Sequence, residues 1–304
     1  MVSAPKLSYL GESWIGCKRG SQRLLKNKTK PKGVIMMKRR TFLTSSLAAA
    51  FGGVFGVGGY ADQIEGTRDR WALELRIYHF PNVEKRDAFA RFIERAAIPA
   101  LNRIEIQPVG VWTLSKEDNR RIPEGYNETD LFVLIPHRRF DSVFTLIDRL
   151  TNDPDFVSAA KRLFSEESLP YERFESSLSL AFTQWPRVTV PTRASDRIAQ
   201  LRIYESPNDE RALAKLDMFN IGGELRIFQK VGLTPVFFGQ TLIGTRLPKL
   251  TYMLAFPNKE AMRTAWRRFV QDPDWKALSQ DPTYKNTVSR ITNLILRPTS
   301  GSQI

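Results

Sequence analysis

Two matching groups of polar side chains, one in each half of the sequence, are the strongest candidates for binding a ligand. They occupy alternate positions of two short stretches rich in β-forming residues: Glu74, Arg76 and Tyr78 in the first half, and Gln200, Arg202 and Tyr204 in the second. Alternate residues of a strand share one face, so the members of each trio project together. The forked donors of arginine and the hydroxyl of tyrosine suit a small anionic or polar ligand.

The same six residues also have a purely structural interpretation. A buried arginine without a counter-charge is very costly, so Glu74 and other carboxylates would pair with the arginines inside the fold. Leu75 and Ile77 point away from the first trio, and we expect this aliphatic pair to meet the helices. Both trios would then face the space between the two halves of the chain, where two arginines and two tyrosines would approach one another.

The two histidines of the chain, His79 and His137, give a second candidate site. We expect them to end two parallel neighbouring strands and to share one rim, where they could be metal or haem ligands or an acid and a base. The observations that follow favour the alternative, that they are ordinary residues at strand ends. The second half has Glu205 in place of a histidine, no HExxH spacing occurs, and two histidines do not complete a usual zinc site. The sequence therefore names no cofactor.

The net charge of +14 does not indicate a nucleic-acid-binding protein. Of the 46 basic and 32 acidic residues, 11 basic residues and one acid, Glu12, lie in residues 1–40, which leaves a net charge of +4 for the rest of the chain. Nucleic-acid-binding domains usually carry a concentrated basic face. The one cysteine, Cys17, also lies in this leader, so the remainder has no disulfide, thiolate metal site or cysteine nucleophile.

Residues 37–61 resemble a twin-arginine signal peptide, with an uncharged stretch rich in Gly and Ala after its basic start. The residues that carry this resemblance are Arg39, Arg40, Phe42 and Leu43. We expect the twin-arginine export machinery as a partner, cleavage after Ala61, and a periplasmic or extracellular mature chain without a stable membrane span. An uncleaved anchor is the alternative. Residues 1–36 are interpreted as a wrongly assigned start or as an extended basic region of the signal.

An internal repeat organises the rest of the chain. The segment ELRIY at residues 74–78 returns as QLRIY at 200–204, 126 residues later, and DPDF at 153–156 returns as DPDW at 272–275, 119 residues later. Both copies show the same succession of strand and helix patterns, βαββαβ, which includes expected strands at residues 72–79 and 249–256 and helices at 208–231 and 273–280. The last of these helices would begin with Pro273 after its cap, Asp272. Several similar segments that return in the same order indicate a duplicated unit.

The repeat predicts an α+β fold made of two tandem ferredoxin-like βαββαβ units. We place the first unit at residues 72–183, a linker at 184–197 and the second unit at 198–298. Each unit would hold both helices on one face of a four-stranded antiparallel sheet and leave the other face bare. Because two bare faces can cover each other, we expect a pseudo-dimeric α/β barrel within one polypeptide.

The succession of these segments resembles NIPSNAP domains, which belong to the dimeric α/β-barrel superfamily. The residues that carry the resemblance are 75–78, 109–112 and 153–156 in the first copy, and 201–204, 236–239 and 272–275 in the second. The second copy looks like the exported, two-domain bacterial members through residues 232–240 and 291–297. The resemblance covers nearly all of residues 72–297. It implies the barrel fold and brings no catalytic residues with it.

Three functions stay open at this point. The first is an exported protein that binds a small polar or anionic ligand between its two domains. The second is an oxygenase-like or haem-related enzyme of the dimeric α/β-barrel type. The third is a non-catalytic interaction module that builds a homo-oligomer. A closed polar cavity lined by the predicted arginines and tyrosines would favour the first two, and a filled interior with an apolar external patch would favour the third.

Overall fold

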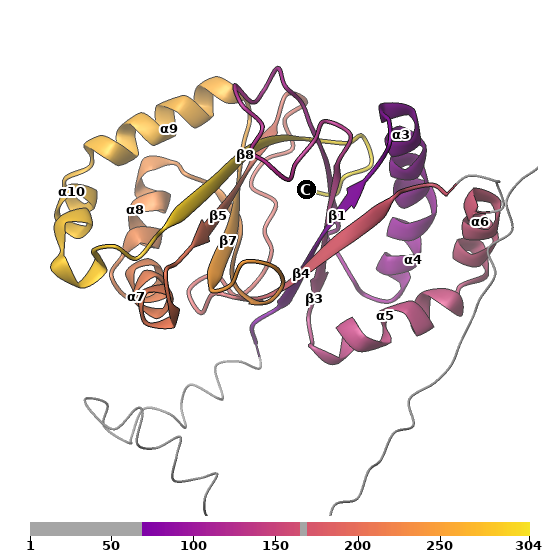
Figure 1. Cartoon of the computed structure of the whole chain (residues 1–304), viewed down its shortest axis with the longest axis horizontal. Helices are drawn as coiled ribbons and strands as arrows, with labels where there is room; N and C mark the ends of the chain where they lie inside the picture. Colours follow the sequence, from indigo (N-terminus) through magenta and orange to yellow (C-terminus); the bar gives the residue numbers. More distant parts are fainter. Residues whose placement is uncertain (1–68, 165–168) are drawn as a thin grey trace, which may run out of the picture. The chain divides into compact units, whose positions relative to one another are not determined.

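The folded part of the chain is a strand barrel with helices around it (Figure 1). The computed structural model describes residues 69–164 and 169–304, all of which belong to one compact unit. The predicted leader, residues 1–61, lies outside the described residues, and so do the export-signal residues Arg39, Arg40, Phe42 and Leu43.

Within the described ranges, eight antiparallel strands close into a barrel in the order β1-β3-β2-β8-β5-β7-β6-β4. The strands are β1 (Ala72–His79), β2 (Gly110–Leu114), β3 (Leu131–His137), β4 (Arg173–Ala181), β5 (Ile198–Glu205), β6 (Pro235–Ile243), β7 (Lys249–Phe256) and β8 (Arg290–Pro298). Each half contributes four neighbouring strands, and the halves join where β2 pairs with β8 and β4 pairs with β6. The expected α+β barrel is therefore confirmed as a closed one.

The helices lie outside the barrel, with those of the first half on one side and those of the second half on the other (Figure 1). They are α3 (Val83–Phe92), α4 (Ile98–Arg103), α5 (Asp141–Thr151), α6 (Pro154–Phe164), α7 (Asp209–Asn220), α8 (Glu224–Val231), α9 (Lys259–Gln271) and α10 (Pro273–Gln280), with a π-helical turn at Ile93–Ala97 and a 3-10 turn at Pro282–Tyr284. Side chains of Asn82, Asn208 and Asn258 cap α3, α7 and α9 by accepting a backbone hydrogen bond. Asp272 caps α10, which begins with a proline as predicted.

The barrel interior is one apolar core that both halves build together. Leu75 and Phe132 enter it from the first half, and Leu201, Phe237 and Met253 enter it from the second. Each half also packs a separate apolar cluster between its strands and its own helices. Burying one such side chain contributes about 1.5–3 kcal/mol, so neither half has a complete core without the other.

Two segments outside the strands fill one end of this barrel. Val188, in the predicted linker at residues 184–197, belongs to the interior core, and so does the C-terminal Ile304. The backbone of the predicted linker is held next to the start of β1, because Trp71 N donates to Pro186 O at 2.9 Å. Apolar side chains from both segments therefore pack into this end of the barrel.

The predicted orientation of the first strand of each half is wrong. Leu75 and Ile77 line the barrel interior. Tyr78 lies on the other face, in the cluster beneath the helices of the first half, and Tyr204 does the same in the second half. Both faces of these strands are buried, one by the opposite half and one by helices. The alternation of side chains along a strand therefore identifies residues that share a face, but it does not show which face lines the barrel interior.

The predicted arrangement of the two histidines is also wrong. β1 and β3 are neighbours but run antiparallel, with Ala72 opposite His137 and Tyr78 opposite Leu131. His79 and His137 therefore lie at opposite ends of the barrel. The reason is topological: the helical connection returns the chain so that β2 runs parallel to β1, and the following hairpin then reverses the direction of β3.

Candidate binding site at the polar end of the barrel

The predicted trio of the first half is satisfied by protein partners on the helix side of β1. The Arg76 guanidinium donates two hydrogen bonds to the Glu74 carboxylate, at 2.7 and 3.1 Å, and Ser176 Oγ donates to it at 2.8 Å. Burial would raise the pKa of Glu74, but hydrogen bonds with His137 and Arg76 outweigh burial and lower this pKa to about 2. The arginine also reaches the Tyr78 hydroxyl at 3.4 Å. This is the structural pairing that the sequence allowed.

The second trio is also built into the protein, with one exception. Gln200 Oε1 accepts a hydrogen bond from Trp266 Nε1 at 2.7 Å, and the hydroxyls of Tyr204 and Tyr252 lie 2.9 Å apart. The exception is Arg202, whose guanidinium lies over the Trp266 ring at 4.8 Å. Its buried Nε finds no hydrogen-bond partner in the described part of the chain.

The two trios do not meet. Three strands separate β1 from β5 in either direction around the barrel, and each trio faces the helices of its own half. The expectation that Arg76 and Tyr78 would approach Arg202 and Tyr204 is therefore wrong, because the barrel turns the opposite face of both strands inward. A ligand between the halves would meet other residues.

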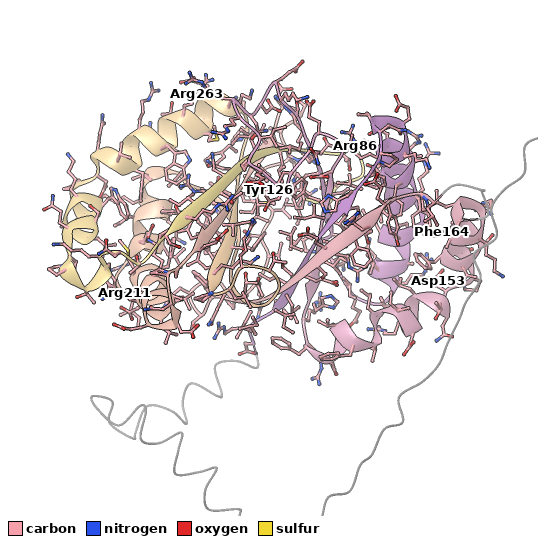
Figure 2. All side chains as sticks on the ribbon, viewed as in Figure 1. Arg86, Tyr126, Asp153, Phe164, Arg211 and Arg263 are labelled. Carbon is pink, nitrogen blue, oxygen red and sulfur yellow. The ribbon has the colours of Figure 1, made fainter. Side chains whose placement is uncertain are left out.

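A polar cluster of both halves lies at the end of the barrel where β1 and β5 finish. We call it the polar mouth and define it by His79, Tyr126, Asp130, Glu175, Glu205, Arg246 and Lys249. Tyr126 comes from the loop between β2 and β3 and lies between the two groups of helices (Figure 2). Except for His79, the sequence pointed to none of these residues as a site.

One acid–base pair from each half stands at the mouth, at equivalent positions of the repeat. In the first half, His79 at the end of β1 lies beside Asp130, which directly precedes β3. In the second half, Glu205 at the end of β5 is opposite Lys249 at the start of β7, so acid and base have exchanged strands. The first pair is closed, since His79 Nδ1 lies 2.9 Å from Asp130 Oδ1. The second is open, because Glu205 instead lies 3.2 Å from Arg246 Nε.

The closed pair has the geometry of a proton acceptor. Asp130 is fully buried, and burial raises its pKa despite hydrogen bonds from Asn127 N and from His79. Because Nδ1 of His79 is held by this carboxylate, its Nε2 is directed toward the mouth, 3.6 Å from Glu175 Oε1. A histidine that a carboxylate orients in this way is placed to exchange a proton with a group in the mouth.

The open pair leaves a buried amine without a counter-ion. Lys249 is 7% exposed, and no carboxylate oxygen of the described residues lies within 4 Å of its Nζ. Burial lowers the pKa of Lys249 and the neighbouring Arg246 lowers it further, against the opposing influence of Glu205 and Glu175. An amine in this state can bind an anion or act as a nucleophile.

Lys249 lines a small cavity that leads from the mouth into the barrel. The cavity has a volume of about 30 Å³, enough for one or two water molecules or the head of a small anion. Its deep wall is apolar and its outer wall carries charges and hydroxyls. Ile77 and Phe237 belong to the apolar lining, and Ser177, Thr251, Glu175 and Arg246 belong to the polar lining.

The metal and membrane expectations can be compared with the described residues. These residues hold no group of three or more His, Cys, Asp or Glu side chains that could bind a metal ion. Across residues 69–164 and 169–304, no helix is long and apolar enough to cross a membrane.

Residues 199–303 match the family model named NIPSNAP, so the chain carries a NIPSNAP domain in its second half. The resemblance inferred from the repeated segments is confirmed for that half. No curated protein has a matching sequence.

Several solved structures are similar to the chain. An uncharacterised NIPSNAP-like domain protein from Burkholderia xenovorans is 23% identical, with coverage of 34% of this chain and 86% of its own and a TM-score of 0.30. An anthrone oxidase-like protein is 12% identical over 77% of this chain and 93% of its own, with a TM-score of 0.43. Chlorite dismutase from Candidatus Nitrospira defluvii is 8% identical over 79% and 96%, with a TM-score of 0.40. Likenesses at this level give no reaction or ligand for this chain.

Proposed function

We propose that this protein binds a small anionic ligand at the polar mouth, between the two halves of the barrel. One observation carries the proposal: Lys249 is buried against a cavity and has no carboxylate of the described residues within 4 Å. The amine of a largely buried lysine is costly to protonate unless an anion accompanies it. An anion in the cavity would supply that charge, and it would raise the pKa of Lys249 by binding.

The neighbours of Lys249 fit an anion better than a cation. Arg246 lines the same cavity and brings a second positive group. Ser177 on β4 and Thr251 on β7, the strand that begins with Lys249, supply hydroxyl donors to the same cavity. Two carboxylates, Glu205 and Glu175, are unfavourable neighbours of an anion. Glu205 is offset by its ion pair with Arg246, and the Glu175 side chain is 55% exposed and can turn to solvent. The narrow apolar floor restricts the ligand to a few heavy atoms.

The wider context of the proposal comes from the sequence. Residues 37–61 support export by the twin-arginine machinery to the periplasm or the exterior, which would make the chain an exported, two-domain NIPSNAP-type protein. The strand orders β4-β1-β3-β2 and β8-β5-β7-β6 support two tandem ferredoxin-like units as the origin of the barrel.

Ligand-induced stabilisation tests the binding proposal. Sodium formate and sodium acetate are added to the protein, with sodium chloride at equal ionic strength as the reference, and the melting temperature is measured. At a concentration of about 100 times Kd, a ligand stabilises by roughly 2.7 kcal/mol, which for a folded unit of this size is a rise of about 5–11 °C. Lys249→Met should abolish the rise, and Lys249→Arg should keep part of it.

The matched control is Lys276→Met, which removes an exposed lysine of α10. It should respond to formate as the wild-type protein does. Equal stabilisation of the wild-type protein and of Lys249→Met by both carboxylates would refute the site, because the anions would then act elsewhere on the surface.

A further inference from the structure

We propose that Lys249 is a covalent site, at which its amine condenses with the carbonyl carbon of a small 2-oxo acid held in the polar mouth. The inference rests on the proposed function, since it takes the anion-binding cavity as given and names the class of ligand. It adds a chemical step that anion binding alone does not require.

The first support is the state of the amine. Only a neutral amine attacks a carbonyl carbon, and lysines become neutral when they are desolvated or stand next to another cation. Lys249 meets both conditions, because it is buried and shares its cavity with Arg246. The groups that face it are Glu205, Glu175 and Arg246, and the net effect of burial and these charges is a lowered pKa.

The second support is a contrast with Lys215, the other buried lysine in the described residues. Lys215 is 4% exposed, and its Nζ donates a hydrogen bond to Glu224 at 2.7 Å. That contact engages the amine within the helix-side core, among the rings of Tyr204 and Phe219. Lys249 has no such partner and borders open space, so of these two buried amines it is the one that a small molecule can reach.

The third support is that Arg246 can hold the carboxylate of the ligand while Lys249 reacts. A guanidinium has five N–H donors, and the ion pair with Glu205 uses the Nε of Arg246. Arg246 also hydrogen-bonds with the Tyr126 hydroxyl at the mouth. The donors that neither contact uses can hold the carboxylate of a 2-oxo acid, whose carbonyl carbon is directly bonded to that carboxylate. Arg246 would then fix the acid group while Lys249, at the same wall of the barrel, meets the adjacent carbon.

The condensation is balanced without any redox partner. The Lys249 nitrogen forms a bond to the carbonyl carbon, the oxygen takes a proton, and loss of one water molecule gives a C=N bond. The protons can pass through Glu175, which lines the cavity and lies 3.6 Å from His79 Nε2. The buried Asp130 holds the other ring nitrogen of His79, so this histidine can store the proton between steps.

Reductive trapping tests the inference. The protein is incubated with glyoxylate and sodium cyanoborohydride at neutral pH, the hydride of the reagent reduces the imine, and peptide mass spectrometry locates the carboxymethylated lysine. We expect one dominant adduct on Lys249, its complete loss in Lys249→Gln and in Lys249→Arg, and unchanged labelling of Lys249 in the control Lys276→Gln. Formate should slow the labelling of Lys249 by competing for Arg246.

Two outcomes separate the inference from the proposed function. If Lys249 is labelled no faster than exposed lysines such as Lys276, the covalent step is refuted, while stabilisation by formate in the wild-type protein and in Lys249→Arg would still support anion binding. If neither labelling of Lys249 nor stabilisation by formate is observed, both proposals fail. A circular dichroism spectrum of each variant confirms that the barrel has folded.

Discussion

Replacing Glu224 by glutamine should destabilise this protein far more than a change of one carboxylate oxygen suggests. The side chains of Glu224 and Lys215 are only 3% and 6% exposed and lie 2.7 Å apart beside an apolar core of aromatic and aliphatic residues. Breaking a buried ion pair by removing one partner costs about 3–5 kcal/mol, because the other charge stays buried and unpaired. The charge of Glu224 also acts on Arg202, whose Nε has no partner in the described residues. Glu224→Gln therefore leaves Lys215 without its counter-charge and removes the smallest of the favourable influences on Arg202.

Chemical unfolding and melting at pH 7 measure this effect. A loss of about 3–5 kcal/mol corresponds to a fall of roughly 6–20 °C in melting temperature for a unit of this size. Lys215→Met should cost less, since the remaining Glu224 can take up a proton, and burial already raises its pKa. The double variant Lys215→Met with Glu224→Leu should recover most of the lost stability, because both charges are gone.

The control for this series is Glu260→Gln on α9. Glu260 lies 3.7 Å from Arg263, and both side chains are about two-thirds exposed. An exposed helical pair of this kind is worth about 0.5 kcal/mol or less. If Glu224→Gln and Glu260→Gln lose the same stability, the assumption that burial makes the Lys215–Glu224 contact important is wrong.

Three further outcomes follow from individual side chains. The pKa of Glu74 is lowered from an ordinary 4.5 to about 2. The ionised carboxylate therefore contributes roughly 3 kcal/mol to the free energy of unfolding above pH 4.5, and this contribution is lost as the pH falls toward 2. In Glu74→Gln, the free energy of unfolding should depend less on pH between 4.5 and 2. Burial and the hydrogen bond to Asp217 raise the pKa of Tyr284 to about 12, and Asp217→Asn should lower it in an NMR titration of the tyrosine ring. Gly232 ends α8 at φ 85°, so Gly232→Ala should cost about 1 kcal/mol in the free energy of unfolding, although a Cβ there would touch nothing within 4 Å.

The secondary structure was largely predictable because the repeat supplies two independent copies of each pattern. Strands at 72–79 and 249–256 and the helix at 273–280 have the predicted bounds. The predicted helix at 208–231 is interrupted, since Gly223 takes a left-handed φ of 99° between α7 and α8. Local periodicity gives the helical pattern on both sides but does not show where a glycine pair will break it.

The candidate site was not predictable from secondary-structure patterns, because its residues come together only through contacts across the barrel. Arg246 and Lys249 lie close together at the hairpin between β6 and β7, but Glu205 ends β5 and His79 and Asp130 come from the other half of the chain. No single sequence motif therefore contains the mouth. The sequence predicts Arg76 and Arg202 as site residues because they share the strand face that was expected to line the barrel interior. In a strand that is buried on both faces, polarity marks the side with the better hydrogen-bond partners, and here that side lies under the helices.

A barrel built from a single polypeptide need not have two-fold symmetry, because its two halves can carry different side chains. In an assembly of two identical chains, every rim side chain would occur in duplicate, and a ligand on the axis would see the same surroundings from either direction. In this chain, β1 ends in His79 where β5 ends in Glu205, and β3 is preceded by Asp130 where β7 begins with Lys249. The opening therefore has two unlike walls, so under the proposed function a ligand whose two ends differ would bind in one orientation.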